Sequence, residues 1–198
     1  MAKKFGNFYT LRDLLGKGFD PIAIRFLLLS THYRAQFNFT FEGLEAAVSA
    51  VERLRNFVRR LQDADGAGSD GKVAELVRGV QAGFGEAMDD DLNVSVALAA
   101  LFDFVREVNG LLDAGVVSRG EADEVGAVMR GFDGVLGVVG EVEAEKLPPE
   151  AEKLIQERER ARKVGDWAEA DALRVRLREL GVVVEDTPQG VRWRLEKG

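Results

Sequence analysis

The sequence predicts a mainly α protein in which an antiparallel helical bundle is followed by a small module made of a helical hairpin and a short β-hairpin. Two observations predict the bundle: apolar residues recur mostly at spacings of three and four, and only 4 prolines occur in 198 residues. A third predicts the module, because charged helical segments after Pro148-Pro149 give way to two short runs typical of strands. With 46% hydrophobic residues, the chain can bury one sizeable core and a smaller appendage.

The first helices of the bundle are indicated by the residues that would start them. Asp20 is typical of an N-cap and Pro21 of a first helical turn, so we expect a helix over the apolar run that follows. Thr40 is expected to cap a second, longer helix with one apolar stripe. That stripe contains Leu44, Ala47, Val48, Val51, Leu54, Phe57, Val58 and Leu61. The opposite face carries Arg53, Arg55, Arg59 and Arg60.

The rest of the bundle is expected to consist of three helices. Residues 63–71 have no apolar anchor and no periodicity, so they predict a flexible surface loop. Helices are expected at about 72–88 and 94–112. The sequence Ser118-Arg119-Gly120-Glu121 has the pattern of a capping box, which predicts a helix that ends near Leu136.

The last part of the chain is expected to form a separate module of residues 148–198, with Pro148-Pro149 as the hinge. A highly charged helix is expected over 150–163, and Gly165 fits its stop. Asp166 fits the N-cap of a second helix running to Leu180, which would complete a tight helical hairpin. Such a module buries little surface by itself, so we expect it to lean on the bundle.

Two strands are expected after this helical hairpin. The runs 182–184 and 191–195 are rich in valine and flank residues 185–190, whose Thr-Pro-Gln-Gly sequence suits a turn. The second run alternates as Val-Arg-Trp-Arg-Leu, so Trp193 is expected to pack inward or shield the hairpin.

Composition excludes several classes of site. The chain has no cysteine and a single histidine, which excludes disulfides and a structural zinc cage built from this chain alone. No run of about 18 apolar residues occurs, and the first residues are basic rather than typical of a secretory signal. A cytoplasmic protein is therefore the default expectation.

The net charge of -7 is unevenly distributed along the chain. Residues 1–62 contain 10 basic and 5 acidic side chains, residues 63–150 contain 6 and 19, and residues 151–198 contain 11 and 10. A polyanion would be repelled by the middle, so a bound nucleic acid should contact the ends. The alternative, that acidic solvated helix faces simply cluster in the middle, stays open.

No catalytic constellation can be assembled from the residues present. His32 lies in an apolar-flanked stretch at an expected helix end, which favours a structural role or contact with an RNA backbone. Asp89-Asp90-Asp91 resembles a divalent-ion site, but three consecutive carboxylates point in different directions. Because a new helix is expected just after them, favourable charge at a helix N-terminus is the preferred interpretation.

Several motifs occur in one order along nearly the whole chain. They are Met1-Ala2-Lys3-Lys4-Phe5-Gly6-Asn7, Phe8 to Leu15, Asp20 to Arg25, Leu28 to Arg34, Asn38 to Glu42, Leu54 to Phe57, Asp89 to Asn93, Gly165 to Asp171 and Glu185 to Trp193. In this order they resemble cysteinyl-tRNA synthetase from its K-M-S-K-S-L-G-N signature loop onward. Each motif alone is weakly specific, but so many in sequence are hard to produce by chance.

The resemblance implies a carboxy-terminal half of that enzyme, with a bundle of the class I synthetase anticodon-binding type at residues 20–147. Residues 1–19 would be a remnant of the signature loop and a connector, and Lys3 would match the lysine that binds ATP phosphates. Ala2 and Lys4 depart from the serines of the motif. ATP and zinc are expected in the full enzyme, whose catalytic domain would be missing here, and the isolated chain is expected to be inactive.

The resemblance also assigns residues that would read the anticodon of cysteine tRNA. The matching positions are Arg162, Trp167, Asp171 and Asp186. A guanidinium can donate to guanine acceptors, a carboxylate can accept from base amines, and a tryptophan can stack on a base. Two alternatives stay open: Trp167 could plug the helical hairpin against the bundle, and Asp171 could pair with Arg174 on the same helix.

Other basic residues are expected to hold the tRNA backbone. On the long helix these are Arg55 and Arg59, and on the second strand Arg192 and Arg194. The contact would be sequence-independent because it involves phosphates.

Two further functions remain as alternatives. One is a free-standing tRNA-binding module without enzymatic activity, which differs from the first interpretation only in the missing amino-terminal domain. The other is a related amide ligase that joins cysteine to a sugar amine. That ligase is disfavoured because it would not need an anticodon-reading tail.

Overall fold

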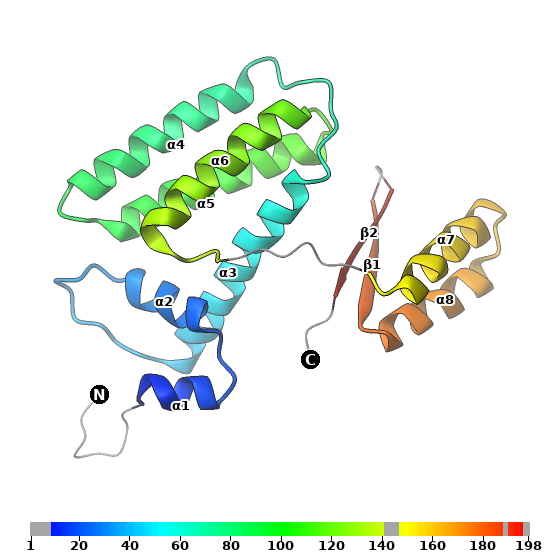
Figure 1. Cartoon of the computed structure of the whole chain (residues 1–198), viewed down its shortest axis with the longest axis horizontal. Coiled ribbons are helices and arrows are strands. Elements are labelled where there is room, and N and C mark those ends of the chain that lie inside the picture. The colour runs from blue at the N-terminus through cyan, green and yellow to red at the C-terminus, as the bar shows by residue number, and fades with distance from the viewer. Residues whose placement is uncertain (1–8, 141–146, 188–189, 196–198) are drawn as a thin grey trace. The chain divides into compact units, whose positions relative to one another are not determined.

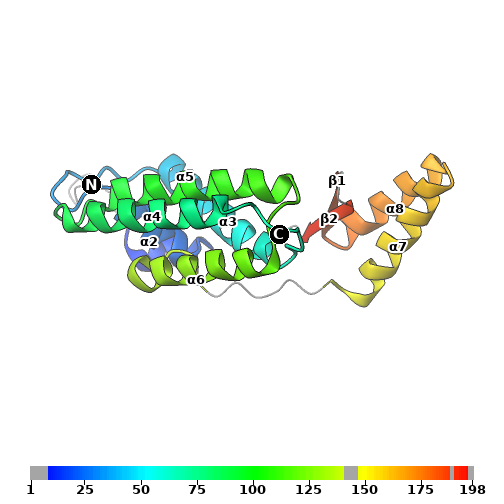
Figure 2. The same cartoon turned by 90° about the horizontal axis from the view of Figure 1, so that it is seen from above.

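The computed structural model describes residues 9–140, 147–187 and 190–195. It divides into two compact units, residues 1–142 and 143–198, which are described separately (Figures 1 and 2). The expectation of a mainly α protein is confirmed, because helices make up most of the described residues and the described strands form a single hairpin. No helix in the described ranges is long and apolar enough to cross a membrane.

The first unit is a helical bundle. Its helices are α1 (Leu11–Gly16), α2 (Pro21–Leu29), α3 (Phe41–Leu61), α4 (Lys72–Asp89), α5 (Val94–Asp113) and α6 (Arg119–Leu136). In Figures 1 and 2, α4 lies along α5, and α6 lies beside α3 and α4, as their contacts require. Short connections between long antiparallel helices bring the apolar stripes of α3 to α6 together.

The expected helix starts are confirmed by hydrogen bonds. Asp20 accepts a hydrogen bond of 2.8 Å from the backbone N–H two residues later, and Thr40 accepts one of 3.0 Å from the N–H three residues later. Ser118 and Glu121 form the expected capping box. Each bond satisfies a backbone donor that has no partner within its helix.

Helix α1 was not expected from the sequence. It begins with a capping box between Thr10 and Asp13, a four-residue pattern that resembles the one at the start of α6. Its Leu14 is buried in a small satellite cluster with Ile24 and Leu44. Leu14 therefore packs this helix of 6 residues against α2 and α3.

The core of the first unit is continuous from α2 to the residues after α6. Its fully buried residues include Leu54, Val73, Ala97, Val108 and Val125. Aromatic rings join the helices: Phe84 of α4 stacks on Phe132 of α6 with centroids 4.3 Å apart. Every residue predicted for the α3 stripe lies in this core, in the satellite cluster or packed against the core.

The segment between α3 and α4 is an anchored loop, so the expectation of a flexible one is wrong. The backbone N–H groups of Gly66 and Gly68 donate to the carbonyls of Val117 and Val116 at 2.8 and 2.9 Å. Ser69 near its end is buried, with 4% of its surface exposed. The loop is anchored by backbone groups, by the Ser69 hydroxyl and by the buried Ala64, none of which forms a periodic pattern.

The aspartate run between α4 and α5 does not supply the cap of α5. Asn93 is the N-cap, and the first turn of α5 contains no acidic residue. Asp91 instead accepts a 2.6 Å hydrogen bond from the Tyr33 hydroxyl and pairs with Arg34 at 3.2 Å. Asp91 thus contacts the loop after α2, and the interpretation of the run as favourable charge before a helix N-terminus stays a prediction.

The second unit has two helices and an antiparallel β-hairpin, as expected. Its elements are α7 (Pro149–Lys163), α8 (Trp167–Glu179), β1 (Val182–Thr187) and β2 (Gly190–Leu195). The register places Val184 opposite Trp193 and Asp186 opposite Val191. Its core contains Ala151, Leu154, Leu173, Leu177, Val182 and Val184, with Trp193 packed against it as expected.

Candidate nucleic-acid interface

The turn between α7 and α8 exposes apolar side chains. Gly165 adopts φ +79° and reverses the chain, and the Asp166 carboxylate accepts from the N–H of Glu169 at 3.1 Å to start α8. Val164 and Trp167, on either side of this turn, are 80% and 62% exposed. Within its own unit Trp167 is therefore exposed, and its indole is available to a partner.

Arg162 joins this turn to the β-hairpin. Its guanidinium carbon lies 5.9 Å from the centroid of the Trp167 ring, a cation-π distance. The same guanidinium forms an ion pair with the carboxylate of Asp186 in β1. Three of the four residues expected to read an anticodon are thus brought together from α7, α8 and β1.

Asp186 is held by a second arginine that the sequence analysis missed. Arg158 donates from both terminal nitrogens to the two oxygens of the Asp186 carboxylate, at 2.9 and 2.7 Å. Only 4% of the surface of Arg158 is exposed, because it lies on the buried face of α7 with Leu154 and Ala161. The sequence did contain a signal: Arg158 lies four residues after Leu154 and three before Ala161, a spacing that places it on the apolar face of the helix.

The ionised form of Asp186 is favoured by these contacts. Hydrogen bonds from Arg158 lower the pKa of Asp186 below its ordinary value, against the opposing effect of burial, and the charges of Arg158, Arg162 and Arg174 act in the same direction. The same hydrogen bonds raise the pKa of Arg158. At neutral pH the carboxylate is therefore a charged hydrogen-bond acceptor, and 37% of its side chain is exposed.

The fourth predicted residue, Asp171, lies one turn beyond Trp167 on α8 and is exposed. It acts on Arg158 through its charge. The alternative pairing of Asp171 with Arg174 is not formed among the described residues. The structure thus leaves Asp171 accessible near the cluster without a direct contact to it.

Three predicted residues cannot be placed by their side chains. Lys3 lies outside the described residues. Arg192 and Arg194 pair through their backbones with Glu185 and Val183, but their side chains also lie outside the described part. Their predicted roles remain predictions.

Comparisons with known proteins show what each unit is similar to. Residues 144–194 match the sequence model of the cysteinyl-tRNA ligase anticodon binding domain, and residues 83–140 match that of the DALR domain. The chain is 47% identical, over 97% of its length, to the cysteine-tRNA ligase of Protochlamydia amoebophila. It is 38% identical over 98% of its length to that of Koribacter versatilis and 40% identical over 97% to that of Chlamydia muridarum.

The chain belongs to the cysteine-tRNA ligase family. It covers 40%, 46% and 42% of these three relatives, so it spans less than half the length of each. The cysteinyl-tRNA ligase anticodon binding domain lies within the second unit, where Arg162, Trp167 and Asp186 meet.

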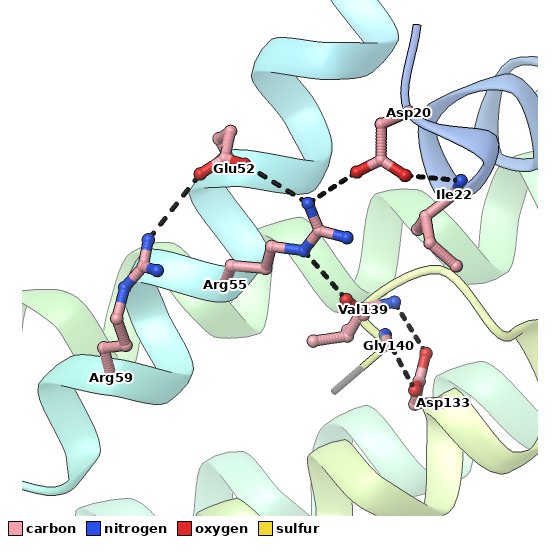
Figure 3. Close-up of polar contacts among 8 residues, drawn as sticks. All are labelled: Asp20, Ile22, Glu52, Arg55, Arg59, Asp133, Val139 and Gly140. Carbon is pink, nitrogen blue, oxygen red and sulfur yellow. Dashed lines mark hydrogen bonds and ion pairs between the residues drawn. The ribbon is translucent and has the colours of Figure 1, made fainter. Parts of the chain in front are cut away.

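In this member of the family, Arg55 is directed into the first unit (Figure 3). Its guanidinium donates to Asp20 at 2.6 Å, to Glu52 at 3.2 Å and to the carbonyl of Val139 at 3.0 Å. The side chain is 14% exposed. Because Asp20 also caps α2, Arg55 links the start of α2, the middle of α3 and the segment after α6.

That segment is itself fixed by Asp133 of α6 (Figure 3). The Asp133 carboxylate accepts from the N–H groups of Val138 and Val139, both at 2.7 Å, and of Gly140 at 3.2 Å. These bonds hold the Val139 carbonyl where Arg55 can donate to it. Arg55 is therefore part of the folded framework.

The other arginines of the predicted basic face also have internal partners. Arg59 pairs with Glu52 at 3.6 Å, and Arg60 pairs with Asp113. The Arg53 guanidinium carbon lies 5.1 Å from the centroid of the Phe102 ring. Binding of a tRNA backbone by Arg55 and Arg59 stays a prediction, and it would have to compete with these contacts.

No group of acidic residues and histidines in the described ranges forms a metal site. His32 stacks on Tyr33 with ring centroids 4.9 Å apart, and its Nε2 lies 3.9 Å from Asp91. These contacts with Tyr33 and Asp91 fit the structural role considered for His32.

Proposed function

We propose that this chain binds cysteine tRNA and that its second unit recognises the anticodon. The observation that carries the proposal is the meeting of Arg162, Trp167 and Asp186 at one partly exposed site within the region that matches the anticodon binding domain. An unpaired base offers a face for stacking and a Watson-Crick edge for hydrogen bonds. The site offers an exposed indole, a guanidinium and an ionised carboxylate.

These groups suit a guanine in an unpaired loop. Its N1–H and N2–H groups are donors that a carboxylate can accept together, and its O6 and N7 are acceptors for a guanidinium. Stacking on the exposed indole of Trp167 would add about 1 to 3 kcal/mol per base. Asp186 and Arg162 would therefore supply specificity, Trp167 would supply affinity, and Asp171 would accept from a neighbouring base amine.

The chain would act as the tRNA-binding part of a cysteine-tRNA ligase that joins cysteine to its tRNA with ATP through an aminoacyl-adenylate. Lys3 would belong to the signature loop that binds ATP phosphates. Zinc and the nucleotide site would belong to a catalytic domain in the same or a separate chain, and the chain by itself would be inactive. The cytoplasm is the proposed location of this activity.

The proposal is tested with RNA hairpins that carry the anticodon arm of cysteine tRNA. We expect the chain to bind the hairpin with GCA, the anticodon of cysteine tRNA (the GCA hairpin). Replacing the guanine of this anticodon by adenine should lower the affinity by about tenfold. Trp167→Ala should weaken binding to both hairpins, whereas Val175→Ala, an exposed change on the same helix, should leave it unchanged. Equal affinity for the two hairpins would contradict anticodon recognition.

A further inference from the structure

The acceptor sites of Asp186 are mostly occupied within the protein. Its Oδ1 accepts from Arg158 at 2.9 Å and forms an ion pair with one guanidinium nitrogen of Arg162, and its Oδ2 accepts from Arg158 at 2.7 Å. A carboxylate offers about four lone-pair sites, so three donors leave about one. A base edge that presents two donors therefore needs one of the arginines to leave the carboxylate.

The two arginines differ in how easily they can leave. Arg158 is buried and bidentate, and its release would leave a charge without a partner in the interior of the unit. The Arg162 side chain is 34% exposed, uses one nitrogen and already lies beside the exposed Trp167 ring. Water can solvate Arg162 when it moves, so its exchange costs less.

On the basis of the proposed function, we propose that Arg158 is a positioning residue that fixes the Asp186 carboxylate, whereas Arg162 is an exchangeable partner that leaves it when a guanine binds. Arg158 does not touch the base. It holds both carboxylate oxygens in one plane, and the departure of Arg162 frees an acceptor site on Oδ1. The released guanidinium then lies near the guanine O6 and N7 while remaining beside Trp167.

Such a site should distinguish guanine from hypoxanthine, because hypoxanthine lacks the N2 amino group. Two donors require a carboxylate with fixed orientation, whereas one donor does not. Loss of the bidentate contact at Arg158 should therefore abolish the preference for guanine over hypoxanthine while binding itself persists. Arg158→Lys is the informative variant, because lysine keeps the charge but lacks the planar fork.

The first experiment measures the affinity of the full chain for a GCA hairpin and for the same hairpin with inosine in place of guanosine. The wild-type chain should prefer guanosine by about tenfold. Arg158→Lys should bind both hairpins nearly equally and should raise the Asp186 pKa in a carboxyl NMR titration. The matched control is Arg160→Lys, an exposed position on the same helix, which should keep the preference.

The second experiment needs no variant and therefore does not depend on the folding of one. In the arginine-labelled wild-type chain, saturation with the GCA hairpin should shift the guanidinium signals of Arg162. The signals of Arg158 should remain those of a hydrogen-bonded, slowly rotating group. If Arg158 also loses its slow rotation, or if Arg162 keeps its contact with Asp186, the proposal is overturned.

The outcomes separate this inference from the proposed function. If the wild-type chain binds neither hairpin, or fails to distinguish any anticodon change, the proposed function fails. If the wild-type chain prefers guanosine and Arg158→Lys prefers it equally with an unchanged Asp186 pKa, the function stands and the positioning role of Arg158 is wrong.

Discussion

Ser69 and Glu121, which are 52 residues apart, join the loop before α4 to the first turn of α6. The Glu121 carboxylate accepts from the Ser69 N–H at 3.0 Å and from its hydroxyl, while it also accepts from the Ser118 N–H at 2.8 Å. The Ser69 hydroxyl oxygen in turn accepts from the N–H of Val73 at 3.0 Å. One carboxylate thus connects the starts of two helices.

This contact predicts a pH dependence of stability. Hydrogen bonds from Ser69 are the main cause that lowers the pKa of Glu121 from 4.5 to about 2. A group with a lowered pKa in the folded state stabilises it fully above its unfolded pKa and loses that contribution as the pH falls. Between about pH 4.5 and 2, the chain should therefore lose about 1 to 2 kcal/mol of stability through Glu121.

Urea unfolding at pH 7, 4 and 3 measures this contribution. Glu121→Gln should be less stable than the wild type at pH 7, and the difference should shrink as the pH falls. Glu124→Gln, an exposed change on the same helix, should follow the wild-type profile. A constant difference between Glu121→Gln and wild type at all three pH values would contradict the assignment.

Gly66 is predicted to tolerate no side chain. A Cβ at this position would lie 2.5 Å from the carbonyl oxygen of Gly115 and 2.6 Å from the carbonyl carbon of Val116. Backbone cannot move aside cheaply, so Gly66→Ala should destabilise the chain by about 2 kcal/mol. Gly85→Ala is the control, because no atom lies within 4 Å of its Cβ and alanine favours α4 by about 1 kcal/mol. In thermal unfolding, the midpoint temperature should fall for Gly66→Ala and rise for Gly85→Ala.

The contributions of Arg55 and Asp20 to the stability of the first unit are predicted to depend on each other. Arg55→Met should destabilise the first unit by about 2 to 4 kcal/mol, because it removes the ion-pair partner of the partly buried Asp20 carboxylate and the donor to the Val139 carbonyl, whereas Glu52 keeps Arg59. In a double-mutant cycle with Asp20→Asn, the coupling should be about 1 kcal/mol or more. If both single variants keep wild-type stability, the ion pair contributes nothing to the fold and the predicted role of Arg55 in tRNA binding gains weight.

Arg192 and Arg194 are predicted to contact phosphates. Replacing either by glutamine should weaken binding of GCA and altered hairpins by the same factor, and should reduce the slope of log affinity against log salt by about 1. Binding isotherms at several salt concentrations measure both effects. If the substitution weakened binding of the GCA hairpin alone, the arginine would instead contact a base.

The parts of the fold that were predictable from sequence depend on local signals. The cap at Asp20 and the capping box at Ser118 are set by neighbours within four residues, and α3 by a long apolar stripe. The anchored loop before α4 and the contact of Asp91 with Tyr33 depend on partners 48 to 58 residues away, which periodicity does not encode.

The candidate site was predictable to a similar degree. The resemblance to a family identified Arg162, Trp167 and Asp186, and the structure brings them together. Arg158 was missed because α7 is rich in charged residues, so the position of Arg158 between Leu154 and Ala161 was not recognised as a buried one. The basic face of α3 was expected from a count of arginines, yet acidic and carbonyl partners on other elements turn Arg55 inward.

Chemical-shift mapping of the labelled full chain with the GCA hairpin tests the central claim most directly. If the second unit reads the anticodon, the largest shifts should fall on the indole of Trp167, the guanidinium of Arg162 and the residues around Asp186, and a hairpin with an altered anticodon should reduce them. Shifts confined to the first unit, or identical shifts with both hairpins, would contradict the claim.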